Sequence, residues 1–577
     1  MQYSTVMPDA FGWGFHLSPG PLADAVAAHA DGAARAAQGL WAKNPATWSL
    51  DAAVQEKIAN RLGWLTSPAL MVESMARVRA CADAVKSDGF TDVVLLGMGG
   101  SSLAPEVMRA VLGVGPGWPR LHVLDSTDPA AVRAITTTPA TTLFLLASKS
   151  GTTIEPNSLA AHFQRVLHDA GIARWAAHFI AITDEGTELA RRAAAEGFRD
   201  TFINPTDIGG RFSALSFFGV VPSALMGQDV ESMVRSGVAM IDEARTTNVG
   251  AAANPAVGLG LLMAAGATSG RDKLTLVVPD ALEAFGLWVE QLVAESTGKR
   301  GVGVVPIAGE TLGGPKTYGN DRLFVRLRMA GEASEMERDR AMQGLEHAPV
   351  LTLDVADRTA IGAEFARWEI ATAVAGVLLD VNPFDEPNVQ QAKDATKVLL
   401  DRYAAEGALP VKHADRSTAA GVSLPLTAAA RTALGPLSPE AVLATVVSGD
   451  YVGILAYLGP DPALAAALTH FREEVRARTR AATMVGYGPR YLHSTGQLHK
   501  GGANNGVFVL ISTTPAADLD IPGLPYTFGT LEFAQALGDF NSLDATGRRA
   551  IHVHLPTPDP ATLTATLNHL LEHVRGH

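Results

Sequence analysis

Short apolar runs alternate with amphipathic stretches along the chain from residue 91 onward. Short apolar runs are typical of buried strands, and apolar positions that recur three or four residues apart are typical of helices. The pattern predicts strands that begin near residues 91, 121, 141, 177 and 201, with helices between most of them. This alternation indicates a parallel, doubly wound sheet covered by helices.

A second series of strands and helices begins near residue 273. It contains the apolar runs KLTLVVPD, GVGVVPIAG, RLFVRL and VLTLDV, and then predicted helices over about 359–381 and 387–404. We therefore expect an α/β fold with two doubly wound, parallel-sheet domains and helical additions at both ends. The expected boundaries are a helical N-terminal region over 1–90, a first domain over 91–265, a second over 266–404, and a C-terminal extension over 405–577 that has a helical insertion and an αβ segment completing the second domain.

The composition narrows the class of protein. Of 577 residues, 47% are hydrophobic and 18% charged, which excludes a disordered chain, and no apolar run approaches the roughly 18–20 residues of a membrane span. The 46 Lys and Arg against 59 Asp and Glu give a net charge of −13, so we expect no general attraction to nucleic acid or to anionic membranes. An anionic substrate would have to be bound by local groups.

Cysteine usage and the N-terminus point to a cytoplasmic protein. The one cysteine, Cys81, lies in a predicted helix and cannot form a disulfide within the chain, so we expect a buried, inert thiol in a reducing compartment. The N-terminal segment lacks the basic and apolar regions of a secretory signal peptide. No spacing of side chains matches a zinc or calcium site, and we expect neither a metal nor a cofactor.

The segment GMGGSS at 97–102 follows a predicted strand and opens a predicted helix. Glycines let the backbone approach an anion, and the amides at a helix N-terminus face it, so this segment can cradle a phosphate. It misses the G-x-G-x-x-G dinucleotide fingerprint, because Ser102 stands where the third glycine should fall, and it lacks the G-K-[ST] of a P-loop. A tight turn without a ligand is the simpler interpretation.

A second polar loop, ASKSGTT at 147–153, also lies between a predicted strand and a helix. Its hydroxyls and lysine lie at the C-terminal edge of the sheet, where open α/β sheets bind ligands. Helix capping alone would explain the loop. Two such loops on one sheet can instead converge on one phosphate monoester and hold it without hydrolysing it.

Arg211, within GGRFS, stands at the start of an apolar helix that otherwise lacks charge. An arginine there can stabilise an anion that forms during a reaction. Pairing with a nearby carboxylate is an equally simple explanation.

The predicted helix over 283–299 carries Gln291 and Glu295 four residues apart, and therefore on one face. Glu295 lies near the C-terminal end of this helix, where the helix dipole should raise the pKa of a carboxyl group and make it a better base. A glutamate at a helix end is more often a solvated charge, so a catalytic role requires that it lie in a cleft.

In order and spacing, GMGGSS, SKSGTT, GGRFS and QLVAESTGK resemble the motifs of the phosphoglucose isomerase family. A later segment, NPFDEPNVQQAK at 382–393, is similar to that family's N-x-F-D-Q-x-G-V-E-x-x-K motif. The resemblance covers about residues 90–400, and the C-terminal part resembles the isomerase half of bifunctional transaldolase/phosphoglucose isomerases. It implies two sugar-isomerase (SIS) domains and the interconversion of glucose 6-phosphate and fructose 6-phosphate through an enediolate.

The resemblance also implies a role for each motif. Glu295 would move a proton between C1 and C2, Arg211 would stabilise the enediolate, and Lys393 would help the sugar ring to open. Gln291 would line the same face. The sugar phosphate would be held by Gly100, Ser101, Ser148, Lys149, Ser150 and Thr153.

The chain departs from the family at the histidine that opens the ring. The segment TLGGPKTYGNDRLF, where the family usually has it, contains no histidine. A later segment, YLHSTGQLHKGG at 491–502, resembles the L-H-S-x-G-Q motif of some bacterial members but follows Lys393 instead of preceding it. We expect a rearranged second domain that returns His493 to the site, with His499 as the alternative.

A second departure is Glu386, where the family usually has glutamine. A carboxylate there could compete for the cationic groups of the site, or it could lie outside the sugar pocket.

Two other functions stay open. A dual phosphoglucose/phosphomannose isomerase would use the same groups, because the stereochemistry at C2 depends on pocket contacts. A non-catalytic SIS module that senses a sugar phosphate would need the two loops but not Arg211, Glu295 and a histidine. The expected partner is a small-molecule sugar phosphate; the resemblance also allows a homodimer and a functional link to a separate transaldolase, since the chain has no transaldolase-like barrel.

Overall fold

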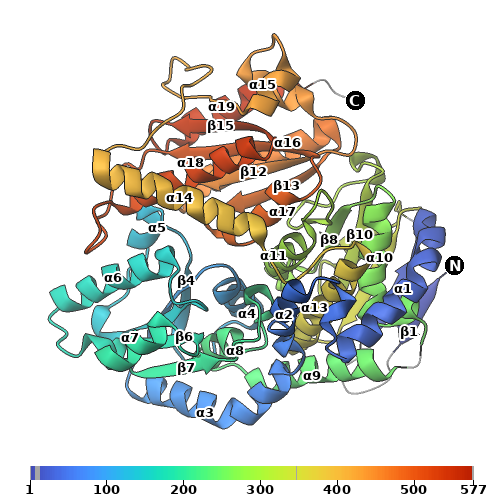
Figure 1. The fold of residues 1–577 in the computed structure, drawn as a ribbon, viewed down its shortest axis with the longest axis horizontal. Helices are drawn as coiled ribbons and strands as arrows, with labels where there is room; N and C mark the ends of the chain where they lie inside the picture. The colour runs from blue at the N-terminus through green and yellow to red at the C-terminus, as the bar shows by residue number, and fades with distance from the viewer. Residues whose placement is uncertain (1, 7–12, 248, 346, 575–577) are drawn as a thin grey trace.

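Three lobes make up the molecule in the computed structural model, which describes residues 2–6, 13–247, 249–345 and 347–574. Each lobe is built on one sheet with helices on its faces (Figure 1). In this view the first lobe, with a five-stranded sheet, lies at the lower left, the second, with a six-stranded sheet, lies at the right, and the third, with a four-stranded sheet, lies at the top.

The first sheet follows the predicted strands. All its strands are parallel, in the order β4-β3-β5-β6-β7, and helices cover both faces, which is why runs such as DVVLL are buried throughout. This order places the point where the winding reverses between β3 and β5, and the loops GMGGSS and SKSGTT follow these two strands. The elements of this lobe are β3 (Asp92–Leu96), β4 (Arg120–Leu124), β5 (Thr142–Ala147), β6 (Phe179–Asp184), β7 (Asp200–Asn204), α3 (Ser67–Ser87), α4 (Leu103–Leu112), α5 (Pro129–Arg133), α6 (Ile154–Asp169), α7 (Glu188–Glu196) and α8 (Phe217–Leu225).

The second sheet, β1-β2-β11-β10-β8-β9, takes two strands from the N-terminal region that we expected to be helical. β2 pairs antiparallel with β11, and burial of Phe15 and Leu17 gives it the alternation of a half-buried strand, too short to stand out in the sequence. The elements are β1 (Tyr3–Val6), β2 (Gly14–Ser18), β8 (Lys273–Val277), β9 (Val305–Ile307), β10 (Arg322–Met329), β11 (Val350–Val355), α1 (Ala23–Trp41), α2 (Ala52–Ala59), α9 (Val230–Thr246), α10 (Val257–Thr268), α11 (Phe285–Thr297), α12 (Glu335–Met342) and α13 (Ile361–Leu378).

The C-terminal region builds a sheet of its own, although we expected it to complete the second domain. Its parallel strands lie in the order β13-β12-β14-β15, and none of the described strands pairs with the second sheet. The edge strands β13 and β9 of the two sheets are neighbours without sharing a ladder. The elements are β12 (Tyr451–Tyr457), β13 (Ala482–Tyr487), β14 (Gly506–Thr513), β15 (Arg549–Leu555), α14 (Pro387–Glu406), α15 (Ala428–Leu434), α16 (Pro462–Thr479), α17 (Gly496–Gly501), α18 (Phe528–Ala545) and α19 (Pro560–Glu572).

Helix α11 lies inside the largest core, which joins the first two lobes. Trp288 of α11 packs edge-on against Phe365 of α13, with ring centroids 4.7 Å apart. Because nearly every position of α11 is buried, any polar side chain on it is removed from bulk water. Among the described residues, no helix combines the length and apolar character needed to cross a membrane.

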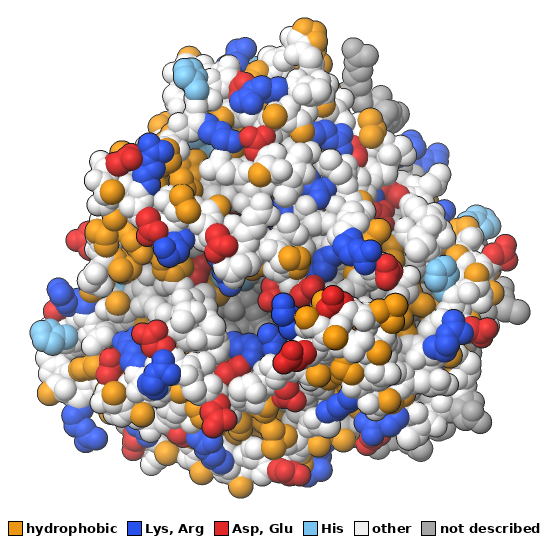
Figure 2. Space-filling model, viewed as in Figure 1, with side chains coloured by type: hydrophobic (Ala, Val, Ile, Leu, Met, Phe, Trp, Pro, Cys, Tyr) orange, Lys and Arg blue, Asp and Glu red, His pale blue; other side chains and the backbone are white. Residues whose placement is uncertain are grey.

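A cleft of about 950 Å³ lies between α6 of the first lobe and α14 of the third. Figure 2 shows the face hollowed near its centre, where these lobes meet. The cleft is lined by the SKSGTT loop, by α14 and by His493, so it receives residues from distant parts of the chain.

Candidate functional site

Glu295 lies in the last turn of α11, buried beside Arg211 and Gln291. Its Oε1 is 3.2 Å from Arg211 Nη1, and Gln291 Nε2 lies 3.4 Å from its Oε2. Burial raises the pKa of Glu295 to about 7; Arg211 opposes this shift, and the nearby carboxylate of Glu386 adds to it. A carboxyl group with this pKa can both accept and return a proton near neutral pH.

Arg211 is fixed in place by groups from two segments, α11 and residues 383–386. Its Nε donates to Ser296 Oγ at 2.7 Å, and its Nη2 donates to the carbonyl oxygens of Pro383 and Asp385 at 2.6 and 2.9 Å. Its Nη1 donates to Glu386 Oε2 at 3.0 Å. The charge of this guanidinium is therefore held rigidly beside the carboxylate of Glu295, as electrostatic stabilisation of a transition state requires.

His493 joins this pair from the third lobe. It ends a short turn that follows β13, and its backbone carbonyl accepts a hydrogen bond from Gln291 Nε2 at 2.7 Å. The same carbonyl lies 2.8 Å from where a Cβ of Gly99 would be, and Gly99 has φ +56, so only glycine suits this position. The GMGGSS loop, α11 and the His493 turn thus meet at one point.

Glu155, a buried carboxylate in the first turn of α6, was not predicted as a site residue. His493 Nε2 lies 2.9 Å from its Oε1, which also accepts a hydrogen bond from Gln535 Nε2 at 2.7 Å. Burial alone would raise the pKa of Glu155, but the charge and hydrogen bond of His493 hold it below its usual value. Acidic residues are common in the first turn of a helix, because the helix dipole favours negative charge there. The position of Glu155 in the sequence therefore did not indicate a functional role.

His499, the alternative to His493, is a core residue. Its Nδ1 lies 3.1 Å from Tyr451 Oη, and its ring packs against Phe508 at a centroid distance of 5.1 Å. Burial and the neighbouring Lys500 and Arg548 hold its pKa well below the usual value, so the ring stays neutral. It does not line the cleft.

The SKSGTT loop holds its hydroxyls in a compact cluster. Ser148 Oγ donates to Thr153 Oγ1 at 3.2 Å and accepts a hydrogen bond from the amide of Gly151, while Ser150 Oγ lies 3.1 Å from Thr152 Oγ1. Ser150 and Thr153 line the cleft. In the other loop, Ser101 is buried in the turn that follows β3.

The predicted lysines differ in their surroundings. The ammonium of Lys149 pairs with Asp184 and donates to the carbonyl of Thr206 at 3.1 Å, so it does not face the cleft. Lys393 lies on α14, lines the cleft and forms no ion pair with the residues that the structure describes. Its charge lowers the pKa of both Glu155 and Glu295.

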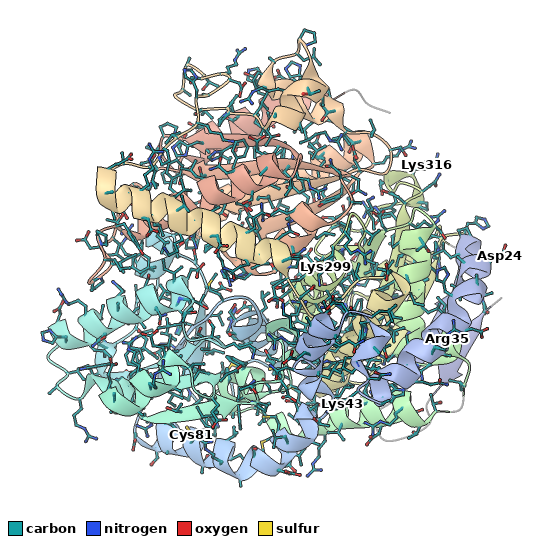
Figure 3. The ribbon with its side chains drawn as sticks, viewed as in Figure 1. Asp24, Arg35, Lys43, Cys81, Lys299 and Lys316 are labelled. Carbon is teal, nitrogen blue, oxygen red and sulfur yellow. The ribbon has the colours of Figure 1, made fainter. Side chains whose placement is uncertain are left out.

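Lys299, which follows α11, was not singled out in the sequence. Figure 3 places it near the centre of the molecule, far from Cys81 on α3. It pairs with Asp385 at 2.8 Å and donates to the carbonyl of Asn382, so it anchors the segment that binds Arg211. Burial and the charge of Arg211 lower its pKa to about 8. Within the described ranges, no cluster of His, Cys, Asp and Glu could hold a metal ion.

Comparison with known proteins agrees with this geometry. The family model described as phosphoglucose isomerase matches residues 69–321. The glucose-6-phosphate isomerase of Rubrobacter xylanophilus is 30% identical over 370 residues, which are 56% of this chain and 85% of the relative. That of Trichormus variabilis is 28% identical over 402 residues, or 59% of this chain and 74% of the relative.

Among solved structures, a glucose-6-phosphate isomerase from Chlamydia trachomatis shares the fold, with a TM-score of 0.55 and 17% identity, over 68% of this chain and 89% of that one. The family match includes the glycine-serine loop, the SKSGTT loop, Arg211 and Glu295. The chain belongs to the phosphoglucose isomerase family.

Proposed function

We propose that this chain is a glucose-6-phosphate isomerase that interconverts glucose 6-phosphate and fructose 6-phosphate through an enediolate. The observation that carries the proposal is the buried Glu295, whose pKa is raised to about 7 and whose carboxylate lies 3.2 Å from Arg211. A base and a fixed cation at this distance suit the removal of a proton from carbon and the stabilisation of the resulting anion.

The substrate phosphate binds at the switch-point edge of the first sheet. Hydroxyls of Ser101, Ser148, Ser150 and Thr153 and the amides at the starts of α4 and α6 supply neutral donors, and Lys393 supplies a positive charge across the cleft. Lys149 takes part only if it leaves Asp184, so its role is to hold the loop until then. With the phosphate bound there, C1 and C2 point toward α11. Glu295 itself does not line the cleft, and Gln291 joins it to His493, which does.

Ring opening falls to His493. Glu155 binds its Nε2 and so fixes the ring, while Nδ1 makes no hydrogen bond with the described residues. The imidazole passes a proton between the ring oxygen and the C1 hydroxyl, and Lys393 lines the same cleft.

Proton transfer falls to Glu295. The carboxylate takes the proton from C2 of the open aldose, a proton moves from O2 to O1, and the carboxylic acid returns the carbon-bound proton to C1. Arg211 neutralises the enediolate that forms between these two steps. One base is sufficient because the two carbons are adjacent.

Replacing the base tests the assignment. In Glu295→Gln, we expect kcat to fall by about 100-fold or more, because the amide cannot accept the proton, while binding of the sugar phosphate survives. A coupled assay measures kcat, and calorimetry measures binding. Glu283→Gln, an exposed change just before α11, is the matched control.

Retained turnover in Glu295→Gln would contradict the assignment of Glu295 as the base. A wild-type chain that binds the sugar phosphate but never isomerises it would favour a sensor instead. Turnover of mannose 6-phosphate in the same assay would indicate the dual isomerase.

We further propose a cytoplasmic location, supported by the lone Cys81, whose pKa burial raises to about 12 so that it stays an unreactive thiol. A homodimer is a proposal that rests on the family resemblance, and a functional link to a separate transaldolase is one that rests on the resemblance of the C-terminal part.

A further inference from the structure

Each nitrogen of the Arg211 guanidinium has at least one partner among the described residues. A guanidinium carries five N–H groups. Nε is bound to Ser296, Nη2 to two backbone carbonyls, and Nη1 lies 3.0 Å from Glu386 Oε2 and 3.2 Å from Glu295 Oε1. An enediolate oxygen that approaches Nη1 must therefore compete with the two carboxylates that already lie beside it.

Glu386 is the partner that can leave most readily. Ser296 is fully buried, the two carbonyls belong to the backbone that Lys299 anchors, and Glu295 is the proposed base. The side chain of Glu386 is 45% exposed, and its bond to Arg211 is its one hydrogen bond to the described residues. Swinging this carboxylate into solvent moves neither backbone nor core.

We propose that Glu386 is a positioning residue that occupies Arg211 in the free enzyme and is displaced by the anion that forms on the substrate. The proposal rests on the isomerase function proposed above. The Glu386 carboxylate stays bound to the Arg211 guanidinium until the enediolate forms and replaces it. It also places a second negative charge beside Glu295. It acts through Arg211 and takes no part in proton transfer.

The charges around Glu295 determine how the loss of the Glu386 charge changes the pKa of Glu295, and with it the pH dependence of activity. Arg211, Lys299 and Lys393 favour its carboxylate, and Glu386 opposes it, while Asp385 is paired with Lys299. Removing the charge of Glu386 therefore leaves the three cations less opposed. The pKa of Glu295 should then fall, and activity should persist to lower pH.

The test compares wild type with Glu386→Gln and with Asp380→Asn. The glutamine can still accept a hydrogen bond from Arg211, so the local fold is kept. Asp380→Asn is the matched control: it removes one negative charge six residues before Glu386, from a side chain that is 86% exposed. The probes are arabinonate 5-phosphate, whose carboxylate resembles the enediolate in charge, and glucitol 6-phosphate, which is neutral at C1 and C2.

In Glu386→Gln we expect arabinonate 5-phosphate to bind about two- to fivefold more tightly, because it no longer has to displace a half-exposed ion pair. We expect no tighter binding of glucitol 6-phosphate. The acid limb of kcat/KM should move to lower pH by up to about one unit. Asp380→Asn should change neither measurement.

Unchanged or weaker binding of arabinonate 5-phosphate, or an equal gain for both probes, would overturn the proposal. An acid limb that does not move would overturn it as well. If wild type does not turn over glucose 6-phosphate, the proposed function fails, and the binding comparison still reports on Glu386. If Glu386→Gln does not fold, Glu386→Asp, which draws the carboxylate back from Nη1, must bind arabinonate 5-phosphate more tightly.

Discussion

Glu295 and Glu155 show how neighbouring residues give two buried carboxyl groups different protonation behaviour. Burial by itself raises the pKa of both carboxyl groups. Glu155 receives the charge and hydrogen bond of His493, which hold its pKa low, whereas Glu295 shares Arg211 with Glu386, and its pKa stays high. Such a separation suits one group to hold a histidine and the other to carry a proton.

At this scale we predict that Glu155→Gln slows ring opening. The amide cannot stabilise a protonated His493, so turnover should fall by about tenfold to a hundredfold. Exchange between the ring anomers of glucose 6-phosphate, followed by NMR, should slow together with turnover. Binding of arabinonate 5-phosphate, which has no ring, should stay close to that of wild type.

The matched control is Glu188→Gln, an exposed change in the first turn of α7. Anomer exchange at the wild-type rate in Glu155→Gln would show that His493 works without this carboxylate.

At the scale of elements, the site depends on two turns that touch. The turn over Gly99–Ser101 follows β3, and the turn over Gly210–Phe212 precedes α8 and carries Arg211. A Cβ at Gly100 would lie 1.9 Å from the carbonyl oxygen of Gly210, a distance that forces the backbone to move. The GMGGSS loop and the Arg211 turn can therefore pack together only because position 100 has no side chain.

We predict that Gly100→Ala displaces the Arg211 turn. The free energy of unfolding should fall by about 1 to 3 kcal/mol, as expected for overpacking, and kcat/KM should fall by more than the stability loss explains. Urea unfolding and steady-state kinetics measure the two effects. Gly210→Ala changes the other side of the contact, where a Cβ meets nothing within 4 Å, and should keep wild-type stability.

Equal stability of Gly100→Ala and Gly210→Ala would contradict the close approach of the two turns.

At the scale of the whole molecule, Glu310 links the lobe that carries Glu295 to the lobe that carries His493. It follows β9, binds Arg322 Nη1 at 2.9 Å, and accepts hydrogen bonds from Thr483 N and Oγ1 of β13 at 2.9 and 2.8 Å. Although burial would raise its pKa, Arg322 holds the pKa of Glu310 below 4.5. It therefore contributes stability above this pH that is lost as the pH falls through its folded pKa.

We predict that Glu310→Gln lowers the free energy of unfolding by about 3 kcal/mol or more, because Arg322 stays buried without a counter-charge. Urea unfolding at pH 7 measures the loss, and the variant should lose less additional stability than wild type on acidification. Glu406→Gln, which breaks an exposed pair with Arg402, should cost under about 1 kcal/mol. Equal losses in the two variants would refute a linking role for Glu310.

The sequence alone determined the local features of the fold and of the site. Buried strands such as DVVLL have a period and composition that do not depend on distant contacts, so the alternation of strands and helices was predictable. The two polar loops were placed at one sheet edge because parallel strands present their C-terminal ends together. Arg211 was singled out as a lone charge at the start of an apolar helix, and Glu295 because it shares a helix face with Gln291 near the helix end.

Only the tertiary structure decided the long-range contacts. β2 joins the second sheet through β11, more than three hundred residues away, and a short strand gives no such signal in its own residues. Glu155 meets His493, and Glu386 meets Arg211, through the packing of separate lobes. His493 and His499 share one segment, and burial among Tyr451 and Phe508 rather than sequence pattern makes His499 a core residue. Local periodicity reports which face of an element is buried, whereas the partner that buries it is chosen by the whole chain.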